Sequence, residues 1–216
     1  MKQPLIVFAA ATLLLQSGCV TGRRTLTLNV PTGSIPAPTK GKACIVTVTD
    51  ERVFQNKPSD PSTPSIDGDV TMLSPEGKDR MIGRQRGGFG KAMGDIALAD
   101  NDTVTQRVRA LVTEGLKRGG YEVVADANST VATVTVNIDK FWAWMTPGMW
   151  ALTFESTIST RVTIKTAAGS HSFVVLGNGL NHGQVAKDDN WVEAYDPSFA
   201  DYLANFQKEL NKLEVH

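Results

Sequence analysis

Alternating hydrophobic and polar positions dominate the second half of the chain and predict β-strands there. Residues 131–141 place Val134 and Ile138 on one side and Thr135 on the other, and residues 154–165 alternate in the same way. Pro147-Gly148 between these two runs predicts a turn. One apolar and one polar face are typical of an antiparallel sheet with one face in solvent. Further strands are expected at 25–30, 43–49, 121–124 and 173–180.

Two other segments space their apolar residues three and four positions apart and predict amphipathic helices. In the first, residues 104–118, Thr103 and Gln106 form a capping box at the start, and Gly119-Gly120 ends the helix. In the second, near the C-terminus, Asp196 is the expected N-cap and Pro197 the first helical residue. The expected fold is therefore α+β: an antiparallel β-sheet with two amphipathic helices packed on one face.

A Pro- and Gly-rich interval at about residues 53–102 separates the strand at 43–49 from the first helix. Such a long connection is typically functional or mobile, so we interpret it as an insertion in the domain. Within it, Pro75-Glu-Gly77 predicts a hairpin turn. The expected organisation is a single α+β domain over residues 25–216 that carries this insertion.

The N-terminus predicts an export signal. Lys2 precedes an apolar run, Leu5 to Leu15, which is about half of the roughly 20 residues that a bilayer-spanning helix needs. The small residues Ser17 and Gly18 then precede Cys19, and this order resembles the lipobox of bacterial lipoproteins. The resemblance implies a signal peptide over residues 1–18, acyl chains (palmitate among them) on Cys19, and a lipidated tether over residues 19–24. The same resemblance implies the periplasmic face of the outer membrane, because Val20 stands after the cysteine in place of the Asp that retains such lipoproteins in the inner membrane.

Composition and motifs argue against two classes of function, nucleic-acid binding and nucleotide binding. The 22 basic residues balance the 22 acidic ones, so the chain lacks the electrostatic signature of a nucleic-acid partner. Cys44 lies in an apolar strand and is interpreted as a buried thiol. The run 86–91 lacks the glycine and the Ser or Thr of a phosphate-binding Walker loop, because Gln85 and Ala92 stand in their places.

The histidines His171, His182 and His216 form no pair at metal-ligand spacing, and no G-x-S-x-G elbow is present. We therefore expect no enzyme activity, no catalytic residues, no metal and no cofactor. A hydrolase would require a histidine to converge in space with a carboxylate such as Asp188 or Glu193, which spacing alone does not show.

Trp142, Trp144 and Trp150 surround the predicted turn at Pro147-Gly148. Unbroken strand alternation places all three on the buried face, as an extension of the core. The alternative is an exposed Trp and Met tip that contacts a partner protein or the membrane interface. These three residues are the candidate partner contact, and Trp191, in a polar stretch, fits either interpretation.

The lipobox, a strand followed by Asp50-Glu-Arg52, and a helix that ends Arg118-Gly-Gly-Tyr121 occur in this order. The order resembles the YajG-like family of Gram-negative lipoproteins. The resemblance implies a periplasm-facing outer-membrane lipoprotein, and Asp50 and Arg52 are expected to form a structural pair at a strand end. The preferred function is a non-enzymatic accessory or adaptor for an envelope assembly, in transport, envelope biogenesis or a flagellar base. The expected partners are the membrane, through the lipid anchor, and an envelope protein; the alternative is a periplasmic module that binds a small molecule, lipid or glycan.

Overall fold

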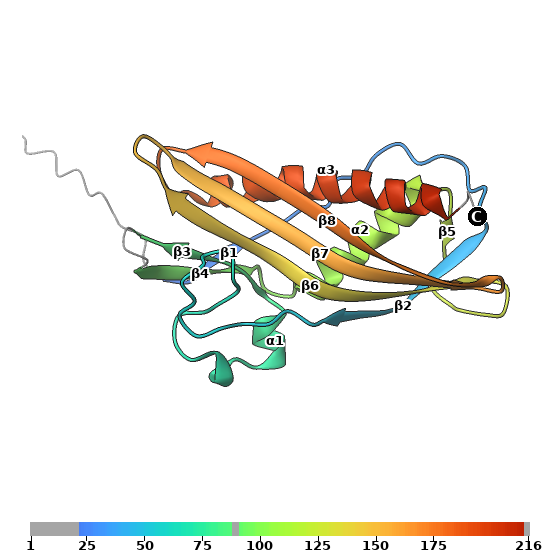
Figure 1. Ribbon diagram of the computed structural model, residues 1–216, viewed down its shortest axis with the longest axis horizontal. Coiled ribbons are helices and arrows are strands. Elements are labelled where there is room, and N and C mark those ends of the chain that lie inside the picture. The colour runs from blue at the N-terminus through green and yellow to red at the C-terminus, as the bar shows by residue number, and fades with distance from the viewer. Residues whose placement is uncertain (1–21, 88–90, 214–216) are drawn as a thin grey trace, which may run out of the picture.

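The computed structural model describes residues 22–87 and 91–213, and these residues form an elongated body built on an eight-stranded sheet (Figure 1). The described strands are β1 (Arg24–Leu26), β2 (Lys42–Asp50), β3 (Met81–Arg86), β4 (Ala92–Leu98), β5 (Glu122–Val123), β6 (Ala132–Pro147), β7 (Leu152–Thr166) and β8 (Gly169–Gly183). The described helices are α1 (Pro75–Lys78), α2 (Val104–Arg118) and α3 (Asp188–Lys212), with a 3-10 turn η1 (Val70–Met72).

The sheet is mixed, so the expected antiparallel sheet is wrong. Among the described strands, β3–β4, β6–β7 and β7–β8 pair antiparallel. In contrast, β1–β4, β2–β5, β2–β6 and β3–β6 pair parallel. Parallel neighbours need a long connection that returns the chain to the same end of the sheet, and α2 lies in the connection from β2 to β6. Alternation reports that one face of a strand is buried and says nothing of the direction of its partner.

Strand β6 organises the sheet because it changes neighbours halfway along one edge. Its first half pairs with β2 as far as Ile138, and its second half pairs with β3 at Ala143 and Trp144. The other edge pairs with β7 throughout, and the register shifts between Ile138 and Lys140. Asp139 is therefore the extra residue of a β-bulge, and a bulge reverses the face that the following side chains take.

The helix predicted at 104–118 is confirmed as α2. Thr103 and Gln106 form the expected capping box, and Gly120, in the left-handed region at φ +87°, follows the helix. The start predicted for the second helix is wrong, because α3 begins at Asp188 and holds Pro197 inside it. Pro197 is exposed, so water can hydrate the carbonyl group that its missing N–H leaves without a helical donor.

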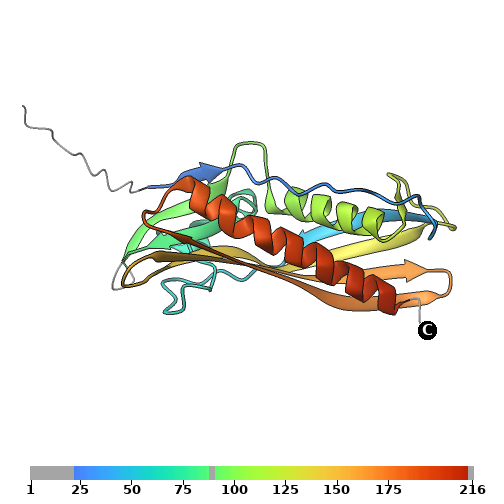
Figure 2. The same cartoon turned by 90° about the horizontal axis from the view of Figure 1, so that it is seen from above.

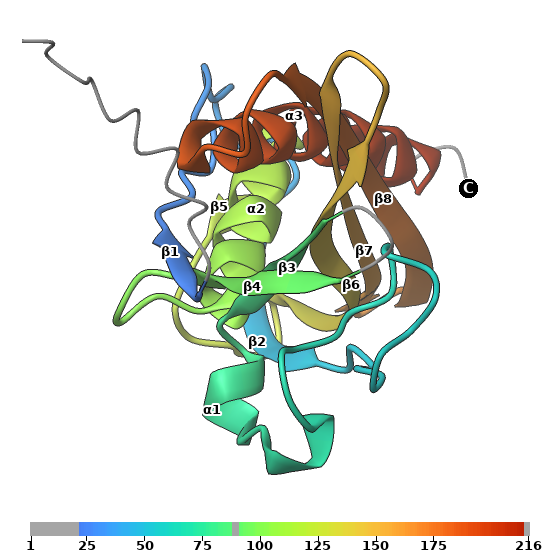
Figure 3. The ribbon, with the colours of Figure 1, turned by 90° about the vertical axis from the view of Figure 1, so that its left-hand side faces the viewer.

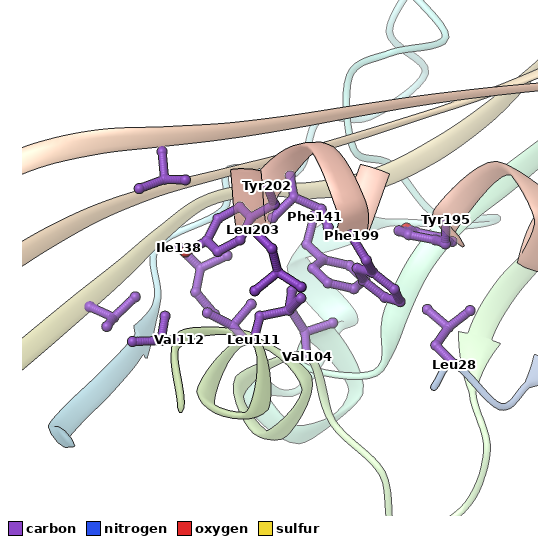
Figure 4. Packing of buried hydrophobic residues seen from close by; sticks show 14 of the residues in the cluster. Leu28, Val104, Leu111, Val112, Ile138, Phe141, Tyr195, Phe199, Tyr202 and Leu203 are labelled. Carbon is purple, nitrogen blue, oxygen red and sulfur yellow. The ribbon is translucent and has the colours of Figure 1, made fainter. Parts of the chain in front are cut away.

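Helices α2 and α3 cover one face of the sheet (Figure 2), and the main core lies between the two layers. In this core Leu111 of α2 and Leu203 of α3 meet Ile138 and Phe141 of β6 (Figure 4). Helix α3 lies very close to β8, where a Cβ atom on Gly179 would be 2.0 Å from the carbonyl oxygen of Ala194. A glycine at this position is therefore required by packing.

The opposite face of the sheet is covered by the segment between β2 and β3, with α1 at its end (Figure 3). Ile66, Met81, Ala97 and Trp142 form a second, smaller core there. The interval 53–102, interpreted as an insertion, thus contributes β3 and β4 to the sheet as well as this cover. The hairpin turn expected at Pro75-Glu-Gly77 is wrong: these residues form α1, whose N-cap Ser74 accepts a hydrogen bond from the Gly77 N–H.

Candidate functional site

The bulge at Asp139 determines where two of the candidate contact residues lie. After it, Phe141, Ala143 and Met145 take the face that Val134 and Ile138 hold before it, so Trp142 and Trp144 turn to the opposite face. The sequence-based parity assumed an unbroken strand and placed both tryptophans on the wrong face.

Trp142 is fully buried in the second core, although on that other face. Its indole Nε1–H donates to the carbonyl oxygen of Pro61 (3.2 Å), and the ring of Phe54 packs edge-on at 5.7 Å between centroids. A partner contact through Trp142 is therefore wrong for this fold, because the segment after β2 covers the side chain.

Trp144 is half-buried and held by polar partners. Its Nε1–H donates to Glu155 Oε2 (2.9 Å), and the Lys140 ammonium lies 5.3 Å from its ring centroid. Trp191, left open by the sequence, is fully buried in α3 against Phe154.

Trp150 is the exposed member of the three candidates. It is 85% exposed and its neighbour Met149 is 87% exposed, both in the turn that joins β6 to β7. The Gly148 N–H donates to the Ala151 carbonyl oxygen (2.9 Å) and closes this turn. Strands β6 and β7 carry the turn that holds these two apolar side chains out to one end of the molecule (Figure 1).

The described chain begins at that same end, which we call the tether end (Figures 1 and 2). The Gly22 N–H donates to the carbonyl oxygen of Met93 (3.1 Å). Gly22 passes so near to β4 that a Cβ atom on Gly94 would lie 1.9 Å from its carbonyl oxygen. Arg24 Nη1 donates to the Ala186 carbonyl oxygen (2.9 Å) and to Asp188 Oδ1 (3.1 Å). The first described residues are therefore bound to β4 and to the start of α3.

The expected signal peptide, residues 1–18, and the expected lipid attachment at Cys19 lie outside the described residues. Close packing at Gly22 and Gly94 is a feature that the sequence analysis missed. The sequence signal for it is weak, because a glycine in a strand indicates only that another backbone or a bulge lies near.

Among the described residues, no histidine forms an ion pair with a carboxylate within 4.0 Å. His171 and His182 are exposed, and His216 lies outside the described residues. Asp188 binds Arg24, while Glu193 accepts a hydrogen bond from Asn181 Nδ2 (2.8 Å). Residues 22–87 and 91–213 hold no group of three or more His, Cys, Asp or Glu side chains suited to a metal ion.

Cys44 is buried, as predicted, and its thiol donates to the carbonyl oxygen of Ala125 (3.2 Å). In the same described ranges, every helix is too short or too polar to cross a membrane.

Asp50 and Arg52 form the structural pair predicted at the end of β2. Arg52 is 1% exposed, and its guanidinium group donates twice to the Asp50 carboxylate (2.9 and 2.8 Å). It also donates to the carbonyl oxygens of Met81 (2.6 Å), Phe141 (2.9 Å) and Lys78 (2.7 Å). Arg52 therefore joins β2, β3 and β6 at the point where β3 replaces β2 beside β6.

No protein-family model matches the chain, and no curated protein matches it. Among solved structures, it is similar to protein XCC0632 from Xanthomonas campestris, described with the family model DUF330, at 10% identity and a TM-score of 0.44 over 88% of this chain and 99% of that one. It is also similar to an uncharacterized protein, at 9% identity and a TM-score of 0.39 over 91% of this chain and 99% of that one.

A third similar structure is described as a "putative neuraminyllactose-binding hemagglutinin homolog from Helicobacter pylori", at 9% identity and a TM-score of 0.37 over 88% of this chain and 96% of that one. At these identities and TM-scores the three structures assign neither a family nor a function to this chain. The YajG-like resemblance stays a prediction.

Proposed function

We propose that this chain is a lipid-anchored, non-enzymatic accessory protein of a bacterial envelope assembly, held by Cys19 at the periplasmic face of the outer membrane. The proposal includes membership of the YajG-like family, which the chain resembles in its sequence. The observation that carries it is the exposed Met149–Trp150 tip at the same end of the molecule as the first described residues. In this proposal the chain binds and positions a partner and catalyses no reaction.

The length of the tether supports an orientation on the membrane. Cys19 precedes Gly22 by three residues, which span at most about 10 Å when fully extended. Gly22 and Arg24 are bound to β4 and to the start of α3, so little further chain is free to lengthen the tether. An acylated Cys19 would therefore hold the tether end close to the lipid headgroups.

The Met149–Trp150 tip supplies the contact in this proposal. Trp is enriched at the energetic centres of protein interfaces, and Met adapts well to varied apolar surfaces. An exposed pair at the tether end would meet a partner at the membrane surface rather than deep in the periplasm. We infer that the partner is a membrane-associated protein of the envelope.

The anchor is tested by metabolic labelling of cells with an alkyne analogue of palmitate. Wild-type protein is expected to take up the label, and Cys19→Ser to lose it. Cys44→Ser is the matched control, because it removes the other cysteine of the chain and leaves the attachment site intact. Equal labelling of wild type and Cys19→Ser would refute the anchor.

The contact is tested by photo-crosslinking in cells with the probe at position 150 and, as control, at Thr163, on β7 away from the tip. One discrete protein adduct at position 150 that is absent at position 163 would support the accessory function and identify the partner. The same adducts at both positions, or none at position 150, would refute a partner contact at the tip.

A further inference from the structure

A pocket lined by cations lies on the face of the sheet opposite to α2 and α3. Its volume is about 260 Å³, and we call it the basic pocket; its lining includes Lys57, Pro58, Asp67, Arg84, Arg86 and Ala92. Arg84 and Arg86 are two positions apart on β3, so their side chains leave the strand on the same face. The segment after β2 forms the opposite wall, through Lys57, Pro58 and Asp67.

Arg86 is a buried cation without a carboxylate in contact. It is 9% exposed, and its guanidinium donates to the Pro58 carbonyl oxygen (2.6 Å) and to Ser65 Oγ (3.0 Å), both uncharged. No described residue forms an ion pair with it within 4.0 Å. Burial and the neighbouring Arg84 guanidinium lower the pKa of Arg86 from its ordinary value, and the Asp60 carboxylate, which forms no ion pair with it, acts in the opposite direction. A buried charge without a counter-charge in contact is costly, and a bound anion would offset that cost.

Arg84 is 5% exposed and lies within ion-pair distance of two carboxylates, those of Asp67 and Asp95. It binds Asp67 Oδ1 through Nη2 (3.3 Å), whereas its buried Nε has no hydrogen-bond partner among the described residues and lies 3.8 Å from Asp95 Oδ1. Burial also raises the pKa of Asp95 from its ordinary value. With Lys57, three cations line a cavity to which Asp67 contributes the one described carboxylate.

The basic pocket lies beside the first described residues. Ala92 lines it, the adjacent Met93 carbonyl oxygen accepts the Gly22 N–H, and Arg23 Nη2 lies 3.9 Å from Asp95 Oδ2. On the tether length given above, an acylated Cys19 would hold the membrane surface near this pocket. Guanidinium groups match the oxygen geometry of a phosphate group.

We propose that the basic pocket binds a phosphate oxyanion through Arg86, Arg84 and Lys57, and that on the anchored protein this phosphate belongs to an anionic lipid headgroup. Phosphate binding in the pocket is argued only from the residues that line it. The headgroup as the source of the phosphate rests on the proposed function, because it requires the tether end to face the membrane. Binding of a headgroup in the basic pocket would fix the orientation of the folded domain relative to the membrane.

The test is calorimetric titration of the full chain, purified in a non-ionic detergent, with inorganic phosphate and then with dihexanoyl-phosphatidylglycerol. We expect saturable binding of both, weakened about tenfold or more by Arg86→Gln because a charged hydrogen bond is lost. Arg161→Gln, on the exposed face of β7, is the matched control and is expected to bind like wild type. Lys57→Ala serves as a second variant, because Lys57 is exposed and its loss leaves the fold intact.

Phosphate binding that depends on Arg86 and Lys57, without binding of the phospholipid, would support the anion pocket and overturn the headgroup. Absence of phosphate binding, or binding unchanged in both variants, would overturn the pocket itself. The palmitate labelling of Cys19 is a separate measurement. A failure of the anchor would therefore remain distinguishable from a failure of the pocket.

Discussion

Arg52→Met is the substitution whose effect the structure defines most sharply. The methionine fills a similar volume but removes every donor, so the carbonyl oxygens of Met81, Phe141 and Lys78 lose their hydrogen bonds. The Asp50 carboxylate, with a side chain only 10% exposed, loses its closest counter-charge and keeps only the Lys78 ammonium, 4.0 Å away. The substitution thus breaks the connection among β2, β3 and β6.

The magnitude follows from these losses. Breaking a buried ion pair by removing one partner costs about 3–5 kcal/mol, and each buried acceptor left without a donor adds up to about 1–3 kcal/mol before water relieves it. We expect the free energy of unfolding to fall by about 4–6 kcal/mol, a large share of the roughly 5–15 kcal/mol that holds a domain folded. With a slope of about 2–3 kcal/mol per molar urea, the midpoint would fall by about 2 M.

Urea denaturation followed by tryptophan fluorescence measures this shift. The matched control is Arg161→Met, whose guanidinium pairs with Asp139 (3.2 Å) and Glu51 (3.8 Å) but is 49% exposed. Exposed pairs contribute about 0–1 kcal/mol, so this variant is expected to unfold almost like wild type. If the two variants lost equal stability, Arg52 would not be the buried junction described here.

Three further outcomes are expected in the same urea assay. Trp142→Ala empties a buried site and should lower the free energy of unfolding by about 3–5 kcal/mol, whereas Trp150→Ala, at the exposed tip, should stay within about 0.5 kcal/mol of wild type; equal losses would contradict the two placements. Gly179→Ala forces a Cβ atom against the Ala194 carbonyl oxygen and should destabilise the fold by about 1–3 kcal/mol or more, while Gly33→Ala, whose new atom meets only the flexible end of Arg118 at 3.0 Å, should have little effect. Burial raises the pKa of Tyr195 and Tyr202, so these phenols lose their protons at a lower pH in the unfolded chain than in the folded one. The free energy of unfolding should therefore be constant below about pH 10. Above that pH, each of the two tyrosines should lower it by up to about 1.4 kcal/mol per pH unit. Phe at both positions should flatten that decline, and an unchanged slope would rule out the two phenols as its cause.

Local signals in the sequence were sufficient for several elements. The capping box at Thr103 and Gln106 depends on residues three positions apart, and α2 begins where it predicts. Alternation identified β6 and β7, because burial of one face repeats every two residues along a strand. The Asp50–Arg52 pair could also be predicted from the sequence, because its two members are two positions apart at the end of a strand.

Tertiary contacts decided what these local signals left open. Asp196-Pro197 reads as a helix start, yet contacts of Trp191 and Ala194 with the core extend α3 by eight residues before it. Glycine weakens a strand by its local preference, whereas Gly177 and Gly179 of β8 lie where α3 packs closest to the sheet. In each case packing against a distant element outweighed the local preference.

In the candidate site, too, some features follow from the local sequence and others only from tertiary contacts. The sequence by itself determined that tryptophans gather around the turn after residue 147, because composition and turn signals are local. The structure decided that Trp142 is core and Trp150 is surface, since one extra residue at Asp139 reverses the strand face and the segment after β2 covers Trp142. The parallel pairing of β2 and β3 with β6, and the convergence of Arg84, Arg86 and Lys57, likewise depend on how distant segments meet in space. Periodicity reports which side of a strand is buried, and only the assembled chain determines what buries it.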